Sequence, residues 1–152
     1  MKNITPKYWV LICFVLINLG VSAQINNIYK IPSDSQVVTL VEEVYSENSE
    51  KEIFNRKARY NFIKNLLQKR IVVTSDKDIL NKIEDEVYLS EVQVFNTFNA
   101  SLKKPLSFNL ANFNPLIYNI NWYDVKPHYY KIDNQNLLLI VFPQEVNNTT
   151  ER

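Results

Sequence analysis

The chain has 152 residues, a formal net charge of +1 at pH 7, and one glycine, one cysteine and one histidine. A charge so close to zero gives no long-range attraction to nucleic acid or to anionic lipid. Phosphate-binding loops, dinucleotide fingerprints and the nucleophile turn of serine hydrolases all use glycine, because the backbone reaches positive φ or approaches a ligand closely. A chain whose single glycine is Gly20 has none of these motifs in the usual form.

The first 23 residues have the pattern of a secretory signal peptide. Lys2 and Lys7 supply the positive charge, residues 8–19 form an apolar run, and residues 21–23 (VSA) are the small residues that a signal peptidase accepts. A transmembrane anchor is the competing interpretation, but the apolar run is shorter than the ~20 residues that a spanning helix needs. We therefore expect cleavage before Gln24, export to the periplasm or out of the cell, and no transmembrane anchor in the mature protein.

The mature part, residues 24–152, has the length of a single globular domain. Removal of the leader takes away Cys13 and Gly20, so the mature part has no thiol, no disulfide and no glycine. Its turns must use Asn and Asp, which tolerate positive φ better than other residues with a side chain. We expect an extended N-terminal lead-in at 24–35 and a frayed polar tail at 145–152.

Residues 36–45 are predicted to form an amphipathic helix. From position 37 the apolar residues repeat at i, i+3, i+4, i+7 and i+8, which places them on one helix face. Ser33 and Gln36 have the spacing of a capping box. A strand is the competing interpretation, because the run VVTLV at 37–41 is rich in β-branched residues. The polar residues 46–51 that follow are expected to turn the chain.

The clearest predicted helix spans residues 50–70. Two apolar stripes with helical spacing lie side by side on it, which indicates a helix that packs against more than one element. One stripe consists of Phe54, Ala58, Phe62 and Leu66, and the other of Ile53, Tyr60, Ile63 and Leu67. The helix also carries basic residues that are typical of a solvated face, although they could bind an anionic partner: Arg56, Lys57, Arg59, Lys64, Lys69 and Arg70.

A short strand at 71–73 and a short helix at 76–87 are expected next. In residues 117–123 the apolar side chains then alternate with more polar ones, which predicts a strand that buries Trp122 with its apolar neighbours. Residues 129–133 and 136–142 predict a hairpin whose second strand is apolar on both faces, and hence central or covered. The sequence therefore predicts an α+β fold, with two or three helices packed on a C-terminal antiparallel three-stranded meander.

Three strings in the C-terminal half carry a resemblance to known proteins: LSEVQVFNTFNASL (89–102), FNPLIYNINWY (113–123) and YYKIDNQNLLLIVFPQ (129–144). They resemble a group of small exported bacterial proteins of unknown function, and the similarity covers roughly residues 60–144. It lies in aromatic and Asn-rich strings and includes no catalytic motif. The resemblance implies export and a single domain, and it implies no mechanism.

Asp124 and His128 are the candidate catalytic residues, because a carboxylate four residues before the only histidine can meet it across a turn as an acid–base pair. A loop histidine without such a role is the simpler interpretation. Tyr123, Tyr129 and Asn121 are the candidate ligand-binding residues, since exposed rings stack on flat ligands and amides supply hydrogen bonds. The competing interpretation packs these rings into the core. We expect no metal site and no cofactor.

Two functions from different classes follow from these features. The favoured one is a non-enzymatic envelope or secreted protein that acts as an interaction module or accessory subunit, with an envelope or secreted protein as its partner and no nucleic acid. The alternative is a small hydrolase or a carbohydrate-binding protein that uses the aromatic, Asp and His cluster at 118–130. An enzyme needs a concave pocket on which its polar groups converge, whereas an interaction module presents an apolar or aromatic patch.

Overall fold

The structure is a computed structural model that describes residues 25–83 and 87–144. The predicted signal peptide (1–23) and the predicted tail (145–152) lie outside these residues. Within the two described ranges, no helix combines the length and the apolar character that crossing a bilayer requires.

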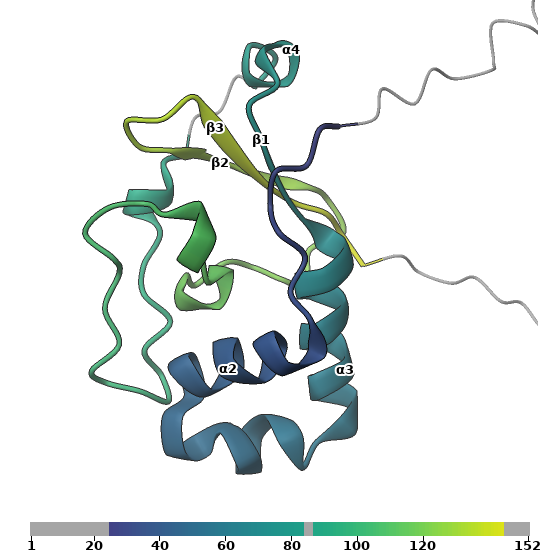
Figure 1. The fold of residues 1–152 in the computed structure, drawn as a ribbon, viewed down its shortest axis with the longest axis vertical. Coiled ribbons are helices and arrows are strands. Elements are labelled where there is room, and N and C mark those ends of the chain that lie inside the picture. Colours follow the sequence, from purple (N-terminus) through teal and green to yellow (C-terminus); the bar gives the residue numbers. More distant parts are fainter. Residues whose placement is uncertain (1–24, 84–86, 145–152) are drawn as a thin grey trace, which may run out of the picture.

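The helices and the sheet form separate layers. Helix α2 (Asp34–Tyr45) lies beneath the sheet, and α3 (Lys57–Asn65) rises along one side toward strand β1 (Ile71–Thr74) (Figure 1). The short helix α4 (Lys77–Leu80) follows β1 and stands at the far end of the molecule. Residues 110–120 fill the space between α2 and the sheet, so a largely irregular segment completes the core.

The sheet has three antiparallel strands in the order β1-β3-β2. Strands β2 (His128–Ile132) and β3 (Leu137–Val141) form the predicted hairpin. Leu139 of β3 is paired with Val73 on one side and with Tyr130 on the other. The run LLLIV therefore occupies the central strand, as its apolar character on both faces predicted, and the α+β class is confirmed.

Two non-glycine residues of the described chain have positive φ, and one of them turns the hairpin. Ile132 is paired with Leu137, so residues 133–136 form the connection, and Asn134 within it has a φ of 56°. The other is Ser46, which ends α2 with a φ of 50°. Asn therefore takes the left-handed conformation at the hairpin, where other chains commonly use glycine.

Residues 117–123 do not form the strand that their alternation predicts, and β1 is the third strand of the sheet instead. A 3₁₀ helix, η6 (Pro115–Ile117), ends at the first residue of the segment, and Tyr118 then makes one isolated antiparallel bridge with Val94. Backbone groups of this segment bond to residues 93–95 rather than to β2. Burial still alternates along it, so the pattern identified the inward side chains but not the pairing partner.

Helix α2 forms where the capping box predicted it, and the competing strand is wrong. The Ser33 hydroxyl accepts a hydrogen bond from the Gln36 N–H, and the Gln36 side chain accepts one from the Ser33 N–H. The lead-in therefore ends at Ser33, two residues earlier than expected. Val37, Val41 and Val44 are completely buried on the inner face. The polar run after α2 contains a 3₁₀ turn, η1 (Ser46–Asn48).

The helix predicted at 50–70 is present but divided. A π-helical stretch, η2 (Glu50–Phe54), precedes α3, and a second one, η3 (Leu66–Arg70), follows it directly. The path breaks at Arg56, which has φ −117° and ψ 80°. The preceding Asn55 is a weak helix former, because its side chain competes for backbone hydrogen bonds. The buried members of the two apolar stripes are Ile53, Ile63, Leu66 and Leu67, whereas Ala58 is exposed.

The remaining helices are short. Asp76 caps α4 by accepting a hydrogen bond from the Asp78 N–H, as the start signal predicted, but α4 ends at Leu80 rather than at residue 87. Residues 84–86, within the predicted helix, lie outside the described ranges. Two further 3₁₀ turns follow in the chain, η4 (Leu89–Glu91) and η5 (Leu110–Asn112).

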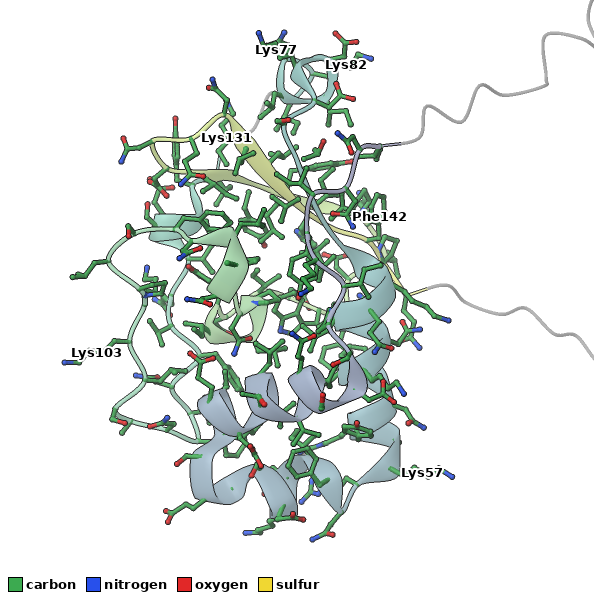
Figure 2. All side chains as sticks on the ribbon, viewed as in Figure 1. Lys57, Lys77, Lys82, Lys103, Lys131 and Phe142 are labelled. Atoms are coloured by element: carbon green, nitrogen blue, oxygen red, sulfur yellow. The ribbon has the colours of Figure 1, made fainter. Side chains whose placement is uncertain are left out.

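Side chains fill the core between α2 and the sheet (Figure 2). Around this core, two asparagine side chains join segments that are distant in the sequence. The Asn114 amide donates to the Leu40 carbonyl at 2.9 Å and to the Glu43 carboxylate at 2.8 Å, and so ties η6 to α2. In the extended lead-in, the Asn27 oxygen accepts from the Val73 N–H at 3.0 Å. The next residue, Ile28, donates its N–H to the Val73 carbonyl at 2.8 Å. The lead-in therefore runs along β1.

Candidate functional site

A pocket of about 520 Å³ lies between α3, the C-terminal end of α2 and residues 116–123. This volume is within the usual range of small-molecule sites, about 300–1,000 Å³. Its walls are mostly apolar, and their aromatic members are Tyr45, Phe62, Phe95, Phe98, Trp122 and Tyr123. The pocket is therefore an aromatic one, and we call it the aromatic pocket below.

Helix α3 and η3 supply one wall of the aromatic pocket. Arg59, Phe62, Ile63 and Leu66 line it at i, i+3, i+4 and i+7, the spacing that gathers side chains on one helix face. Ile63 and Leu66 are buried, whereas Arg59 is exposed. The wide apolar face predicted from the sequence thus serves two surfaces, because part of it packs in the core and part of it faces the pocket.

Tyr123 covers part of this wall. Its ring lies flat on that of Phe62, with centroids 4.7 Å apart and an angle of 11° between the planes. The residue is nevertheless 74% exposed. A second ring pair, Tyr45 and Phe98, stacks at 5.1 Å in the same pocket. The pocket therefore presents ring surfaces to solvent.

Arg70 connects the parts of the protein that form this wall. Its Nε donates to the Phe142 carbonyl at 2.8 Å, and one Nη donates to the Trp122 carbonyl at 2.6 Å. The guanidinium lies 5.4 Å from the centre of the Phe62 ring, within cation–π range. The other Nη has no hydrogen-bond partner within the described ranges. Burial also lowers the pKa of the Arg70 guanidinium.

The structure therefore corrects the position expected for Arg70. The sequence placed it with other basic residues on a solvated helix face, whereas it is only 4% exposed. The reason is that η3 leads directly into β1, so its last residue lies against the end of the sheet near Phe142. Arg70 anchors the chain internally and is not part of a basic surface.

Arg59 is the charged residue of the pocket lining. One of its Nη atoms donates to a Glu52 carboxylate oxygen at 2.9 Å and to the Glu52 carbonyl at 3.3 Å. Arg56 also approaches the same carboxylate oxygen, at 3.5 Å. One carboxylate is thus shared by two guanidinium groups, so these three side chains together have a net positive charge.

Asparagine and tyrosine side chains add hydrogen-bonding groups. The Asn121 oxygen accepts from the Tyr123 N–H at 3.2 Å, so its amide nitrogen is left as a donor. Burial raises the pKa of the Tyr45 hydroxyl, the nearby Tyr123 and Glu52 raise it further, and Arg59 opposes them. Tyr45 itself lines the pocket.

The structure brings Asp124 and His128 together, as their spacing suggested. An Asp124 carboxylate oxygen lies 3.0 Å from Nε2 of His128. The backbone N–H groups of Lys126 and Val125 hold the pKa of the Asp124 carboxyl below its usual value, and His128 lowers it further. Neither residue lines the aromatic pocket. The pair closes the turn before β2, and the described residues add no third hydrogen-bonded side chain to it.

Tyr129 is separated from the other predicted binding residues. With His128 it lines a more open hollow of about 590 Å³, beside Ile79 and Lys82 near α4. Asn121 and Tyr123 line the aromatic pocket. The predicted cluster at 118–130 is therefore divided between two places on the surface.

Several residues of the aromatic pocket were not identified as site residues from the sequence: Tyr45, Arg59, Phe62, Phe95 and Phe98. Phe62 was interpreted as part of a core stripe, and Arg59 as a solvated cation. Tyr45 and Phe98 come from segments far apart in the chain, and only the fold brings them together. The close aromatic spacing at 95–98 (FNTF) was the available signal.

Metal binding and comparison with known proteins do not assign a function to the aromatic pocket. Within residues 25–83 and 87–144, no group of three His, Cys, Asp or Glu side chains is placed to hold a metal ion. No family model, curated protein or solved structure matches the chain. The resemblance of residues 60–144 to small exported proteins therefore stays a prediction, and the function has to be argued from the geometry of the pocket.

Proposed function

We propose that this protein is an exported, non-enzymatic interaction module that binds an apolar group of its partner in the aromatic pocket. One observation carries the proposal: Tyr123 is stacked on Phe62 at the pocket and yet remains 74% exposed. A large ring gains most when water is removed from both faces, and the exposed face of Tyr123 has no cover within the chain described here. A bound apolar group would supply that cover.

The polar groups support binding rather than hydrolysis. Asp124 and His128 form a pair, but the pair lies outside the aromatic pocket, so an occupant of the pocket does not meet it. The pocket itself offers amide and guanidinium groups that orient a ligand and a ring surface that holds it. The hydrolase alternative needs polar groups that converge on one concave surface, and of this pair only His128 lines the second hollow.

The location is part of the proposal and gives the first prediction. Mature protein recovered from the periplasm or the medium should begin at Gln24, because residues 21–23 (VSA) end an apolar run that starts after Lys7. N-terminal sequencing or intact mass spectrometry checks this. Replacing Ala23 with a bulky residue should block cleavage. Recovery of the uncut wild-type chain from membranes would contradict export as a mature protein.

The second prediction concerns the pocket. The chain has two tryptophans, Trp9 in the predicted leader and Trp122 in the pocket, so the mature protein has one indole reporter. N-acetyl-phenylalaninamide, which mimics an aromatic side chain within a polypeptide, should shift the Trp122 indole N–H resonance in an NMR titration. The Tyr123→Ala variant should bind it about threefold to tenfold more weakly, the value of one stacked ring.

Tyr129→Ala is the matched control, because Tyr129 lines the other hollow and its loss should leave the titration unchanged. Equal affinities of the wild type and Tyr123→Ala would show that the pocket is not the binding site. A shift with cellobiose and none with N-acetyl-phenylalaninamide would instead support the carbohydrate-binding alternative.

A further inference from the structure

The hydrogen-bonding groups of the aromatic pocket restrict the chemical class of its ligand. This inference rests on the function proposed above. Two side chains that line the pocket, Arg59 and Asn121, have unused donors. Arg59 uses one Nη for both contacts with Glu52, so its Nε and its other Nη have no hydrogen-bond partner within the described ranges. The amide nitrogen of Asn121 is a further donor without a hydrogen-bond partner within the described ranges, while the amide oxygen accepts from the Tyr123 N–H.

The charges of Arg56, Arg59 and Glu52 also favour an anionic ligand. Glu52 is nearly covered, with 13% of its side chain exposed, and it serves both Arg56 and Arg59. The two arginine side chains are 44% and 49% exposed, so they remain accessible to a second anion. A guanidinium can bind a second carboxylate through its unused edge, because its five N–H donors point in fixed directions.

We propose that the pocket binds a carboxylate that is joined to an apolar ring. The ring lies on the exposed face of Tyr123, and the carboxylate accepts hydrogen bonds from Arg59 and Asn121. A carboxylate has only acceptor atoms, which complements a set of free donors better than a hydroxyl or an amide does. The C-terminal residue of a partner polypeptide and a free aryl carboxylic acid both have this chemistry.

The test compares two peptides that differ only in charge, Ala-Ala-Ala-Phe with a free C-terminus and the same peptide amidated, by NMR titration of the Trp122 indole. The free acid should bind wild-type protein about threefold to fivefold more tightly than the amide, as expected for a partly exposed ion pair. In Arg59→Gln this preference should disappear, so that the acid and the amide bind with equal affinity. Raising the salt concentration should reduce the preference in the wild type.

Lys57→Gln is the matched control, because Lys57 lies two residues from Arg59 at the start of α3 and its side chain points away from the body of the protein (Figure 2). It should retain the preference for the acid. Circular dichroism should show that both variants are folded. If Arg59→Gln is not folded, Arg59→Lys takes its place and should keep part of the preference for the acid.

The outcomes separate this inference from the function on which it rests. Equal binding of acid and amide to the wild type would overturn the carboxylate preference and leave the aromatic pocket as a binding site. Absence of binding by both peptides would overturn both. A third arm with 3-phenylpropionate distinguishes the sources: binding as tight as that of the peptide acid assigns the site to free aryl carboxylates, and weaker binding assigns it to a polypeptide C-terminus.

Discussion

Replacing Leu139 with alanine is expected to lower the free energy of unfolding by about 3–5 kcal/mol. Leu139 is completely buried in the central strand, between Val73 of β1 and Tyr130 of β2. Its truncation removes the transfer free energy of the lost atoms and leaves a cavity that the neighbouring strands cannot close. Domains of this size have a total stability of about 5–15 kcal/mol, so the loss is a large share of it. Urea unfolding followed by circular dichroism measures the difference.

Leu106→Ala is the control for this substitution, because Leu106 is the same residue type in a fully exposed position. Its effect should stay within about 0.5 kcal/mol. Losses of similar size in the two variants would contradict the central place of β3 in the core.

Arg70→Ala is expected to lower the free energy of unfolding by about 2–3 kcal/mol and to weaken binding in the aromatic pocket. Two charge-assisted hydrogen bonds are lost, each with a contribution of about 1.5–3 kcal/mol, while the cost of burying an incompletely paired cation is relieved in part. The carbonyl of Trp122 and the ring of Phe62 both lose the group that holds them. Urea unfolding gives the first effect, and the peptide titration gives the second.

Three further variants identify the cause. Arg70→Lys keeps the charge but lacks the planar fork that reaches the carbonyls of Phe142 and Trp122 together, so it should lose most of the same stability. Lys69→Ala, at the exposed neighbouring position, should change it by no more than about 0.5 kcal/mol. If Arg70→Met were as stable as the wild type, the two hydrogen bonds would contribute nothing net.

Local signals were sufficient where they agreed with each other. Ser33 and Gln36 predicted the start of α2 because a capping box acts within one turn, and the apolar repeat confirmed the period. The hairpin was predictable for the same reason, since its two strands are adjacent in sequence and Asn134 supplies the turn. Non-local pairing was not predictable. Ile71 of β1 is paired with Val141, and periodicity contains no information about such a distant partner.

The candidate site shows the same division. Tyr123 and Asn121 were predicted because their segment alternates, but the opposite rings reach the pocket through the fold alone. Arg59 and Arg70 looked equivalent, since 11 residues are about three turns of an α-helix and place both on nearly the same face. The wider turns of η3, which begins at Leu66 between the two arginines, alter that phase. One arginine consequently lines the pocket, and the other is buried.

The contact between the lead-in and β1 also affects how copies of the protein meet. β1 is an outer strand, and a bare strand edge is a template on which another molecule can add its own strand and begin to aggregate. Here the side chain of Asn27 and the N–H of Ile28 occupy the backbone groups of Val73 from outside. The segment immediately after the predicted cleavage site therefore covers part of this strand edge. Removal of the residues up to and including Ile28 would expose the edge and promote self-association.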